Sequence, residues 1–228
     1  MVLQTGSAVE MPWIAQVPAV LENWYGGEQM GPAIASLLFG DTSPSGKLPM
    51  TFPKALADTP TAGDAARYPG VAGADGIRQV DYSEGLKVGY RWYQSEGIRP
   101  LFPFGHGLSY TSFAYSTPKV TVSHEVKIKF TVKNTGRRTG TEVAQAYVSL
   151  PAATGEPPSR LIGWERVTLA PGQQRTVEIS LSRSDLSGPH LLQYWDSKRS
   201  SWVTARGVYG LSVGGSSGTK ARTSFRVR

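Results

Sequence analysis

Two serine-containing motifs offer residue types for nucleophilic catalysis. Gly214–Gly218 matches G-x-S-x-G, which acts as a nucleophile elbow only where a strand, a sharp turn and a helix follow one another. Ser116–Lys119 matches S-x-x-K, which needs a helix, and Pro118 disfavours one. We expect both to be chance matches. An independent small serine hydrolase or esterase, with His106 or His124 as the base, is kept as the rival hypothesis.

Metal and thiol chemistry have few candidate residues. The chain contains no cysteine, which excludes disulfides, thiolate zinc sites and cysteine nucleophiles. The three histidines are well separated in sequence, which argues against a histidine-rich metal site. We expect no metal site and no cofactor.

Aromatic side chains are the remaining binding candidates, because sugars stack on aromatic faces. They are dense in the first half of the chain, where Trp24, Tyr25 and Trp92 are candidates for substrate binding. The interpretation we favour is that these rings pack folded layers against one another. A carbohydrate-binding module is kept as an alternative.

Charge divides the chain into two parts. Residues 1–110 hold 7 Lys and Arg against 10 Asp and Glu, whereas residues 111–228 hold 17 against 7. Such asymmetry is typical of two domains, and a basic half is suited to binding a polyanion. The basic residues are spread singly along predicted strands, without a nucleic-acid-binding motif. We therefore expect a solvated basic face and no specific nucleic acid partner.

The elements that must position these residues differ between the two parts. In Glu125–Lys133 and Arg175–Leu181, apolar residues alternate with polar ones, which is the period of a strand with one buried face. With the apolar runs 141–150 and 208–213 and the turns between them, residues 111–228 are predicted to form an all-β sandwich.

The first part has mixed periodicity. Val2–Thr5 and Ala19–Tyr25 are predicted strands, and Gly31–Phe39 has the apolar spacing of a helix. Residues 54–80, rich in Ala, Gly, Asp and Pro, are predicted to be a long loop or arm. Residues 82–110 are rich in aromatic residues and glycine and are predicted to bridge the two parts.

Four long blocks carry a family resemblance. They are GGEQMGPAIASLLFGDTSPSGKLPMTFP (26–53), YSEGLKVGYRWY (82–93) followed by PLFPFGHGLSYTSF (100–113), VKNTGRRTGTEVAQAYVSLP (132–151) and LIGWERVTLAPGQQRTVEISL (161–181). In order and spacing these blocks resemble glycoside hydrolase family 3, the family of β-glucosidases and β-xylosidases. The last two resemble its fibronectin type III-like domain.

The resemblance implies a mostly β chain with three segments. These are the C-terminal part of an α/β sandwich domain (1–53), a long arm with an aromatic, glycine-rich junction (54–110) and a fibronectin type III-like, immunoglobulin-like β-sandwich (111–228). The implied parent reaction is retaining hydrolysis of terminal β-linked glucosyl residues. In the family the nucleophile is an Asp of a preceding barrel and the acid/base is a Glu upstream of residues 1–5. The resemblance therefore implies no catalytic residue here and a structural or accessory role.

Four carboxylates of this chain are candidates by residue type to replace that pair. They are Glu28, Asp81, Glu84 and Glu96. A carboxylate at Glu28 favours the dipole of the predicted helix at 31–39, and Glu84 is expected to order the junction by hydrogen bonds. We therefore expect none of them to be catalytic.

Partners and localisation follow from the same features. A sheet of about two strands leaves an edge and an apolar face uncovered, so we expect the missing barrel domain or a second copy of the chain as partner, with a homodimer favoured. A carbohydrate is a further possible ligand. The sequence has no signal-peptide pattern and no apolar stretch of membrane-spanning length, so no membrane partner is expected, and localisation stays open.

Overall fold

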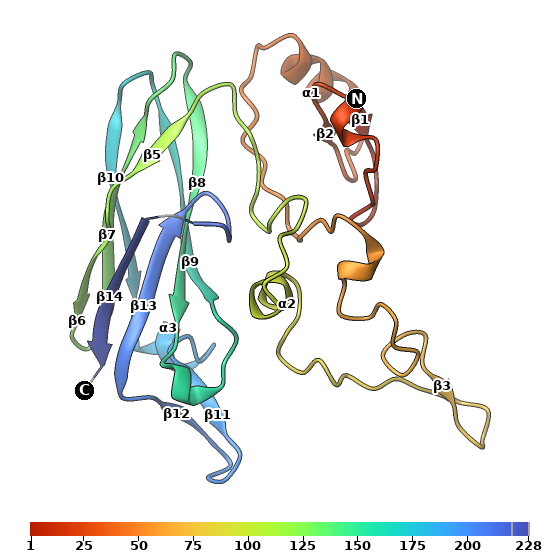
Figure 1. Cartoon of the computed structure of the whole chain (residues 1–228). Helices are drawn as coiled ribbons and strands as arrows, with labels where there is room; N and C mark the ends of the chain where they lie inside the picture. The colour runs from red at the N-terminus through yellow and green to blue at the C-terminus, as the bar shows by residue number, and fades with distance from the viewer. Residues whose placement is uncertain (220, 228) are drawn as a thin grey trace.

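A computed structural model describes residues 1–219 and 221–227 of the chain (Figure 1). A β-sandwich occupies the C-terminal half, and a looser part with short strands and helices lies beside it. Within the described residues, no helix is both long enough and apolar enough to cross a membrane.

The sandwich consists of two four-stranded sheets that face each other. The first sheet has β7 between β10 and β5, and β6 also pairs with β7; the bounds are β5 (Phe113–Tyr115), β6 (Lys119–Val122), β7 (Val126–Asn134) and β10 (Gln174–Leu181). The second sheet has the order β14-β13-β8-β9, with bounds β8 (Gly140–Ser149), β9 (Arg160–Leu169), β13 (Gly207–Gly214) and β14 (Ala221–Val227).

The core lies between these sheets and follows the predicted alternation. The apolar residues of β7 are at most 2% exposed, and they are Val126, Ile128, Phe130 and Val132. On β10, Val177, Ile179 and Leu181 belong to the same buried cluster. Burial of alternate residues from both sheets produces the hydrophobic stabilisation of a closed sandwich.

Small elements lie at the end of the sandwich where β9 begins. They are η3 (Ala152–Thr154), α3 (Arg183–Ser187) and a hairpin of β11 (Gln193–Asp196) and β12 (Ser201–Thr204). The hairpin extends beyond the sandwich (Figure 1).

The N-terminal part contains a parallel pair of two-residue strands, β1 (Val2–Leu3) and β2 (Leu21–Glu22), joined through η1 (Ile14–Gln16). The predicted helix is present as α1 (Met30–Leu38). The predicted strand Ala19–Tyr25 is shorter than expected, because only two of its residues have a β-partner to pair with.

The arm projects away from both units (Figure 1). Its elements are η2 (Leu56–Asp58) and the hairpin of β3 (Val71–Ala72) and β4 (Arg78–Gln79). A short helix, α2 (Tyr90–Ser95), follows the arm and lies between the two parts. Helix α2 is not among the predicted elements, because aromatic residues are weak helix formers and tertiary packing stabilises this single turn and a half.

Candidate functional site

The two blocks around residues 50 and 104 form one structure at the junction. Leu48 N donates to His106 O at 2.8 Å, and Gly105 N donates to Leu48 O at 2.8 Å. Further along, Phe52 forms an antiparallel bridge with Phe102. Segments far apart in sequence thus join through backbone hydrogen bonds and fix where the chain enters the sandwich.

Two glycines allow this close approach. Gly105 has φ +80°, and a Cβ built there would lie 2.5 Å from the Gln145 side chain. A Cβ at Gly107 would collide with the carbonyl oxygen of Gly46. The glycines of the P-F-G-H-G motif are therefore required by backbone conformation and by space.

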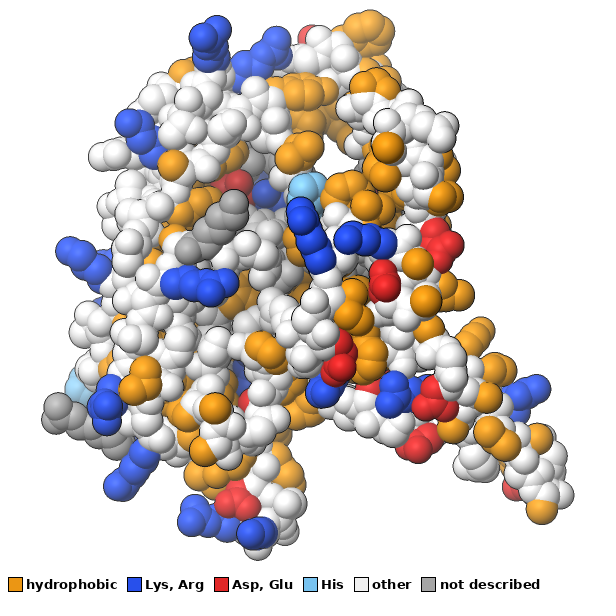
Figure 2. All heavy atoms as spheres, in the orientation of Figure 1, with side chains coloured by type: hydrophobic (Ala, Val, Ile, Leu, Met, Phe, Trp, Pro, Cys, Tyr) orange, Lys and Arg blue, Asp and Glu red, His pale blue; other side chains and the backbone are white. Residues whose placement is uncertain are grey.

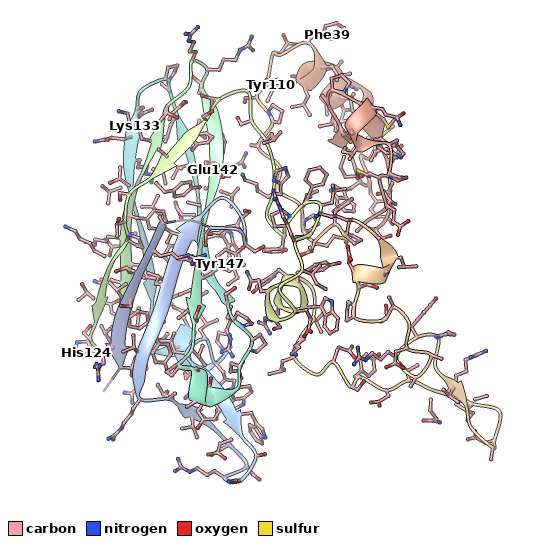
Figure 3. The ribbon with its side chains drawn as sticks, viewed as in Figure 1. Phe39, Tyr110, His124, Lys133, Glu142 and Tyr147 are labelled. Atoms are coloured by element: carbon pink, nitrogen blue, oxygen red, sulfur yellow. The ribbon has the colours of Figure 1, made fainter. Side chains whose placement is uncertain are left out.

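A buried ion pair crosses the junction. Lys47 Nζ lies 2.8 Å from Glu142 Oε1 on β8, and the two side chains are 14% and 9% exposed. Lys47 Nζ also donates to Gly107 O at 3.2 Å, and Glu142 Oε1 accepts from Val143 N at 2.7 Å. Glu142 lies on the face of β8 toward the junction (Figure 3). Both charges have partners, which offsets the cost of removing them from water.

A second polar chain holds the loop after β13. Tyr147 donates its hydroxyl proton to Gln145 Oε1 at 2.5 Å, and Gln145 Nε2 donates to Gly215 O at 2.9 Å. Burial raises the pKa of Tyr147 above its usual range, so its hydroxyl stays a donor. Ser217 N closes the arrangement by donating to Phe104 O at 2.8 Å.

Helix α2 docks on the sandwich through polar contacts. Leu161 N donates to Tyr90 OH at 2.9 Å, and Ser159 Oγ donates to Gln94 Oε1 at 2.6 Å. The Tyr90 ring meets that of Tyr147 edge to face, with centroids 5.7 Å apart. The junction is therefore a continuous packed interface.

The serine motifs lack the geometry of an esterase. Ser216 follows β13 and precedes β14 rather than a helix, and its Oγ accepts from Gly218 N at 3.2 Å. Ser116 Oγ accepts from Thr131 N, and Lys119 begins a strand. His106 stacks on Phe102, at a centroid distance of 4.9 Å.

Among the described residues, no contact joins two of the candidate carboxylates into a catalytic pair. Glu84 is buried beside Arg67, whose Nε lies 3.9 Å from its Oε2, and Glu96 forms an exposed ion pair with Lys87 at 2.8 Å. Glu28 and Asp81 are exposed and belong to no ion pair in the described residues. No group of His, Asp and Glu among those residues has the arrangement of a metal site.

None of the three aromatic candidates lines the cavity beside α2. Trp24 packs edge to face on Phe52 at 5.9 Å, and Tyr25 is 84% exposed. Trp92 donates from Nε1 to Asp58 O at 2.9 Å and has the Arg67 guanidinium 5.8 Å from its ring centroid. A cavity of about 500 Å³ beside α2 is lined by other residues, among them Tyr90, Tyr93, Arg91 and Phe104.

Sequence reasoning overlooked the aromatic residues of the second part. His190, Trp195 and Trp202 come together at the β11–β12 hairpin, where Trp195 and Trp202 face each other across the two strands. The available signal was two tryptophans on either side of the turn-forming stretch D-S-K-R-S-S.

The fold and the junction define a two-part module in which an aromatic, glycine-rich segment joins an α/β fragment to an immunoglobulin-like sandwich. Residues 1–110 match the glycosyl hydrolase family 3 C-terminal domain, and residues 142–217 match the fibronectin type III-like domain. The chain therefore belongs to glycoside hydrolase family 3 and corresponds to the C-terminal part of its β-glucosidases. The predicted resemblance and the mostly β fold class are confirmed.

Curated relatives and solved structures agree on this assignment. The chain is 41% identical to thermostable β-glucosidase B of Acetivibrio thermocellus, over 95% of the chain and 28% of that protein. It is 38% identical to probable β-glucosidase I of Aspergillus niger, over 99% of the chain and 27% of that protein. It superimposes on DesR, a β-glucosidase from Streptomyces venezuelae crystallised with D-glucose, with a TM-score of 0.88 and 40% identity, over all of this chain and 28% of that one.

The chain thus spans under a third of the length of these relatives. In the full-length relatives this region is joined to a catalytic barrel domain. Of the two predicted partners, the barrel domain is confirmed for the relatives.

Proposed function

We propose that this chain is the C-terminal, non-catalytic portion of a retaining β-glucosidase and that its role is to brace the catalytic barrel. The reaction assigned to the whole enzyme is removal of terminal β-linked glucosyl residues. The observation that carries the proposal is the contrast between the closed sandwich core and the exposed apolar surface of the first part of the chain.

That surface is extensive. Large hydrophobic side chains more than half exposed occur on α1, on the arm and at the junction; they include Leu38, Phe39, Leu56, Tyr68, Ile77, Tyr82, Leu86, Val88 and Leu108. Figure 2 shows hydrophobic side chains on the surface of the N-terminal part and of the arm. Many exposed apolar side chains mark an interaction site, and a covering domain is the occupant that the longer relatives suggest.

The carboxylates support the non-catalytic part of the proposal. A retaining glycosidase holds its two carboxyl groups about 5–5.5 Å apart. Here Glu84 lies 3.9 Å from Arg67, a cation that it shares with Asp64, and Glu96 pairs with Lys87 at 2.8 Å. A carboxylate committed to a structural cation is a poor acid or nucleophile.

The test is a complementation assay. The purified chain alone should not hydrolyse nitrophenyl β-glucoside, whereas co-expression with the barrel portion of a family 3 β-glucosidase cut before the matched region should restore turnover. The control pairs the same barrel portion with the chain carrying Glu142→Gln, which weakens the module without touching a catalytic group.

Two results would contradict the proposal. One is glucoside turnover by the chain alone that is lost in Glu84→Gln. The other is hydrolysis of short-chain nitrophenyl esters that is lost in Ser216→Ala, which would support the serine hydrolase alternative.

A further inference from the structure

A pair of tryptophans stands on the exposed face of the β11–β12 hairpin. Trp195 and Trp202 are directly paired across the two strands and therefore project from the same face. They are 50% and 42% exposed, and their rings meet edge to face with centroids 5.6 Å apart and planes at 73°. Two large aromatic surfaces thus remain in contact with solvent, although burying them would be favourable.

A histidine fixes the orientation of one of these rings. The His190 imidazole stacks on Trp202 with a centroid distance of 4.0 Å and an interplanar angle of 9°. His190 Nδ1 lies 2.7 Å from Gln193 Oε1, a hydrogen bond that holds the imidazole in turn. The stacked imidazole therefore restricts the orientation of the Trp202 indole.

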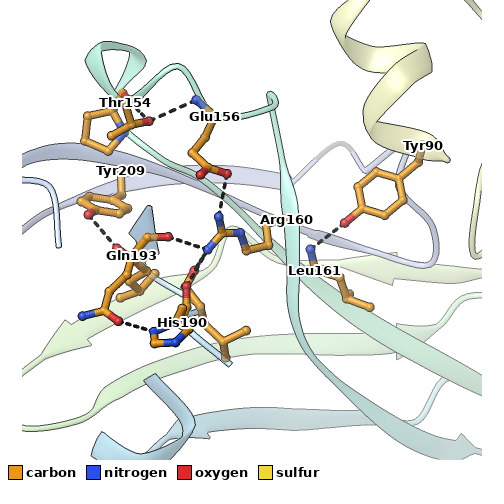
Figure 4. Close-up of polar contacts among 11 residues, drawn as sticks. Tyr90, Thr154, Glu156, Arg160, Leu161, His190, Gln193 and Tyr209 are labelled. Atoms are coloured by element: carbon orange, nitrogen blue, oxygen red, sulfur yellow. Dashed lines mark hydrogen bonds and ion pairs between the residues drawn. The ribbon is translucent and has the colours of Figure 1, made fainter. Parts of the chain in front are cut away.

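The base of the hairpin is anchored by a buried arginine (Figure 4). Arg160 Nη1 donates to the carbonyl oxygens of His190 and Gln193 at 2.6 and 2.8 Å. Its Nη2 forms an ion pair with Glu156 at 2.7 Å, and both side chains are nearly buried, at 13% and 8% exposed. The pairing neutralises the arginine, so it serves as a fixed support.

A buried tyrosine anchors both ends of the hairpin segment. Tyr209, which is fully buried on β13, has its hydroxyl 3.1 Å from Leu192 O and 2.8 Å from Ala205 O. These carbonyls come directly before β11 and directly after β12. The sandwich thus supports the hairpin from inside, which is the condition for a preorganised binding surface.

A cavity of about 240 Å³ adjoins Trp202. It lies where the arm meets the sandwich, and its walls combine apolar residues with hydrogen-bonding groups; they include Leu86, Arg91, Glu156, Arg160, His190 and Trp202. The Arg91 guanidinium makes no hydrogen bond or ion pair with any described residue. It is therefore free to donate to a ligand.

From this geometry we propose that the hairpin and the adjoining cavity bind a neutral β-linked oligosaccharide. In a β-linked glucopyranose the hydroxyls are equatorial, so both ring faces present axial C–H groups that pack on an indole. Trp195 and the part of Trp202 that His190 leaves exposed supply such surfaces, and Arg91, which lines the same cavity as Trp202, is placed to donate to hydroxyl groups at the edge of the sugar.

The observations favour this ligand over two others. A stable dimer buries about 1,200–2,000 Å² in total, far more than two tryptophans cover. An anionic polymer needs several free cations, whereas among the described residues that line this cavity Arg160 is neutralised by Glu156 and Arg91 is the one basic side chain without an ion pair. The choice of a glucan as probe rests on the proposed β-glucosidase function, whereas the site itself rests on the geometry.

The experiment titrates the 228-residue chain with cellotetraose, using maltotetraose, its α-linked isomer, as the ligand control. Binding is followed by the indole Nε1–H signals in ¹H–¹⁵N NMR spectra. We expect cellotetraose to shift the signals of Trp195 and Trp202, and the variants Trp195→Ala and Trp202→Ala each to weaken binding about tenfold or more.

The matched control variant is Trp164→Ala. Trp164 on β9 is 65% exposed but has no aromatic partner among the described rings and lines neither cavity described above. Its replacement should leave the affinity within about twofold. Trp202→Phe keeps a stacking face, and we expect it to retain most of the binding if Trp202→Ala folds poorly.

Three results would overturn the proposal. The first is no cellotetraose binding, or equal weakening by the Trp164 and Trp195 variants. The second is binding of maltotetraose as strong as that of cellotetraose. The third is self-association that Trp195→Ala abolishes with no saccharide-dependent shift, which would assign the tryptophans to a second copy. The readout is binding alone, so its outcome is separate from that of the complementation assay.

Discussion

At the scale of single residues, the junction depends on a charge pair removed from water. Lys47 comes from the first part of the chain and Glu142 from the sandwich, so the pair acts only when the two are docked. Such pairs often add little net stability relative to an apolar pair, but losing one member leaves an uncompensated buried charge. The pair therefore makes docking specific.

Glu142→Gln should lower the free energy of unfolding by about 3–5 kcal/mol, because Lys47 is left buried without a counter-charge. Urea denaturation followed by fluorescence measures the change. Lys129→Met is the control, since the Lys129–Glu178 pair is exposed at 55% and 39% and should contribute below about 1 kcal/mol. A loss as small in Glu142→Gln as in the control would contradict the role of the pair.

His106 should make stability depend on pH. Burial, and secondarily the charge of Lys47, lowers the pKa of His106 below its usual value of about 6.5. The unfolded chain therefore binds a proton at acidic pH that the folded chain resists. The stabilisation is present above the unfolded pKa and is lost as pH falls through the folded pKa.

The pH prediction is tested by measuring unfolding from pH 8 down to pH 5. We expect His106→Gln to reduce the decline in stability at acidic pH, whereas His124→Gln, which removes an exposed ring, should behave like the native chain. An identical slope in His106→Gln and the native chain would refute this assignment.

At the scale of elements, turns decide how the two parts meet. The segment from Phe102 to Gly107 pairs with residues 48–52 and then turns into the sandwich, and it does so without a helix or long strand. Its geometry rests on Gly105, which lies against the Gln145 side chain, and on Gly107, which lies against the backbone of Gly46. We therefore expect substitutions at these positions to weaken the contact between the N-terminal part and the sandwich.

Gly107→Ala should destabilise the chain by roughly 1–3 kcal/mol, because the new Cβ meets a backbone carbonyl that cannot move aside. Gly31→Ala is the contrasting change: no atom lies within 4 Å of its Cβ position, and the residue is in α1. There alanine should stabilise by roughly 0.5–1 kcal/mol. Thermal unfolding of both variants measures the difference in sign, and a loss in both would contradict it.

At the scale of the whole molecule, one half buries its apolar residues and the other displays them. The sandwich core is closed between two sheets, whereas α1 presents Leu38 and Phe39 at 60% and 85% exposure. The two-stranded β1–β2 pair also has free edges. A chain with such a surface needs a partner to cover it.

In the absence of a barrel domain, we expect the chain to self-associate with two-fold symmetry. Light scattering should give about twice the mass of 24.6 kDa. Phe39→Glu should shift the species toward the monomer, because a charge there opposes apolar contact. Val208→Glu, on a half-exposed sandwich position, is the control and should leave the mass unchanged. A native chain that is monomeric at all concentrations would contradict the prediction.

The sequence alone determined the sandwich and the family. Alternation in Glu125–Lys133 and Arg175–Leu181 specifies which face is buried, because side chains in a strand point to opposite faces with a period of two. The motif blocks show the family resemblance because the junction requires their residue types. Their glycines allow close approach of the chain, and their aromatic residues fill the space between the two parts. A local pattern that repeats over many residues is sufficient to predict the fold of that segment.

Only the tertiary structure decided the contacts between distant segments. Nothing in the sequence near Lys47 indicates Glu142, and nothing near Trp202 indicates that Arg160 and Tyr209 support its hairpin. The predicted aromatic candidates were chosen by local density, whereas exposure, stacking and an adjoining cavity single out Trp195 and Trp202. Such sites arise from residues that folding brings together, and sequence proximity carries no information about them.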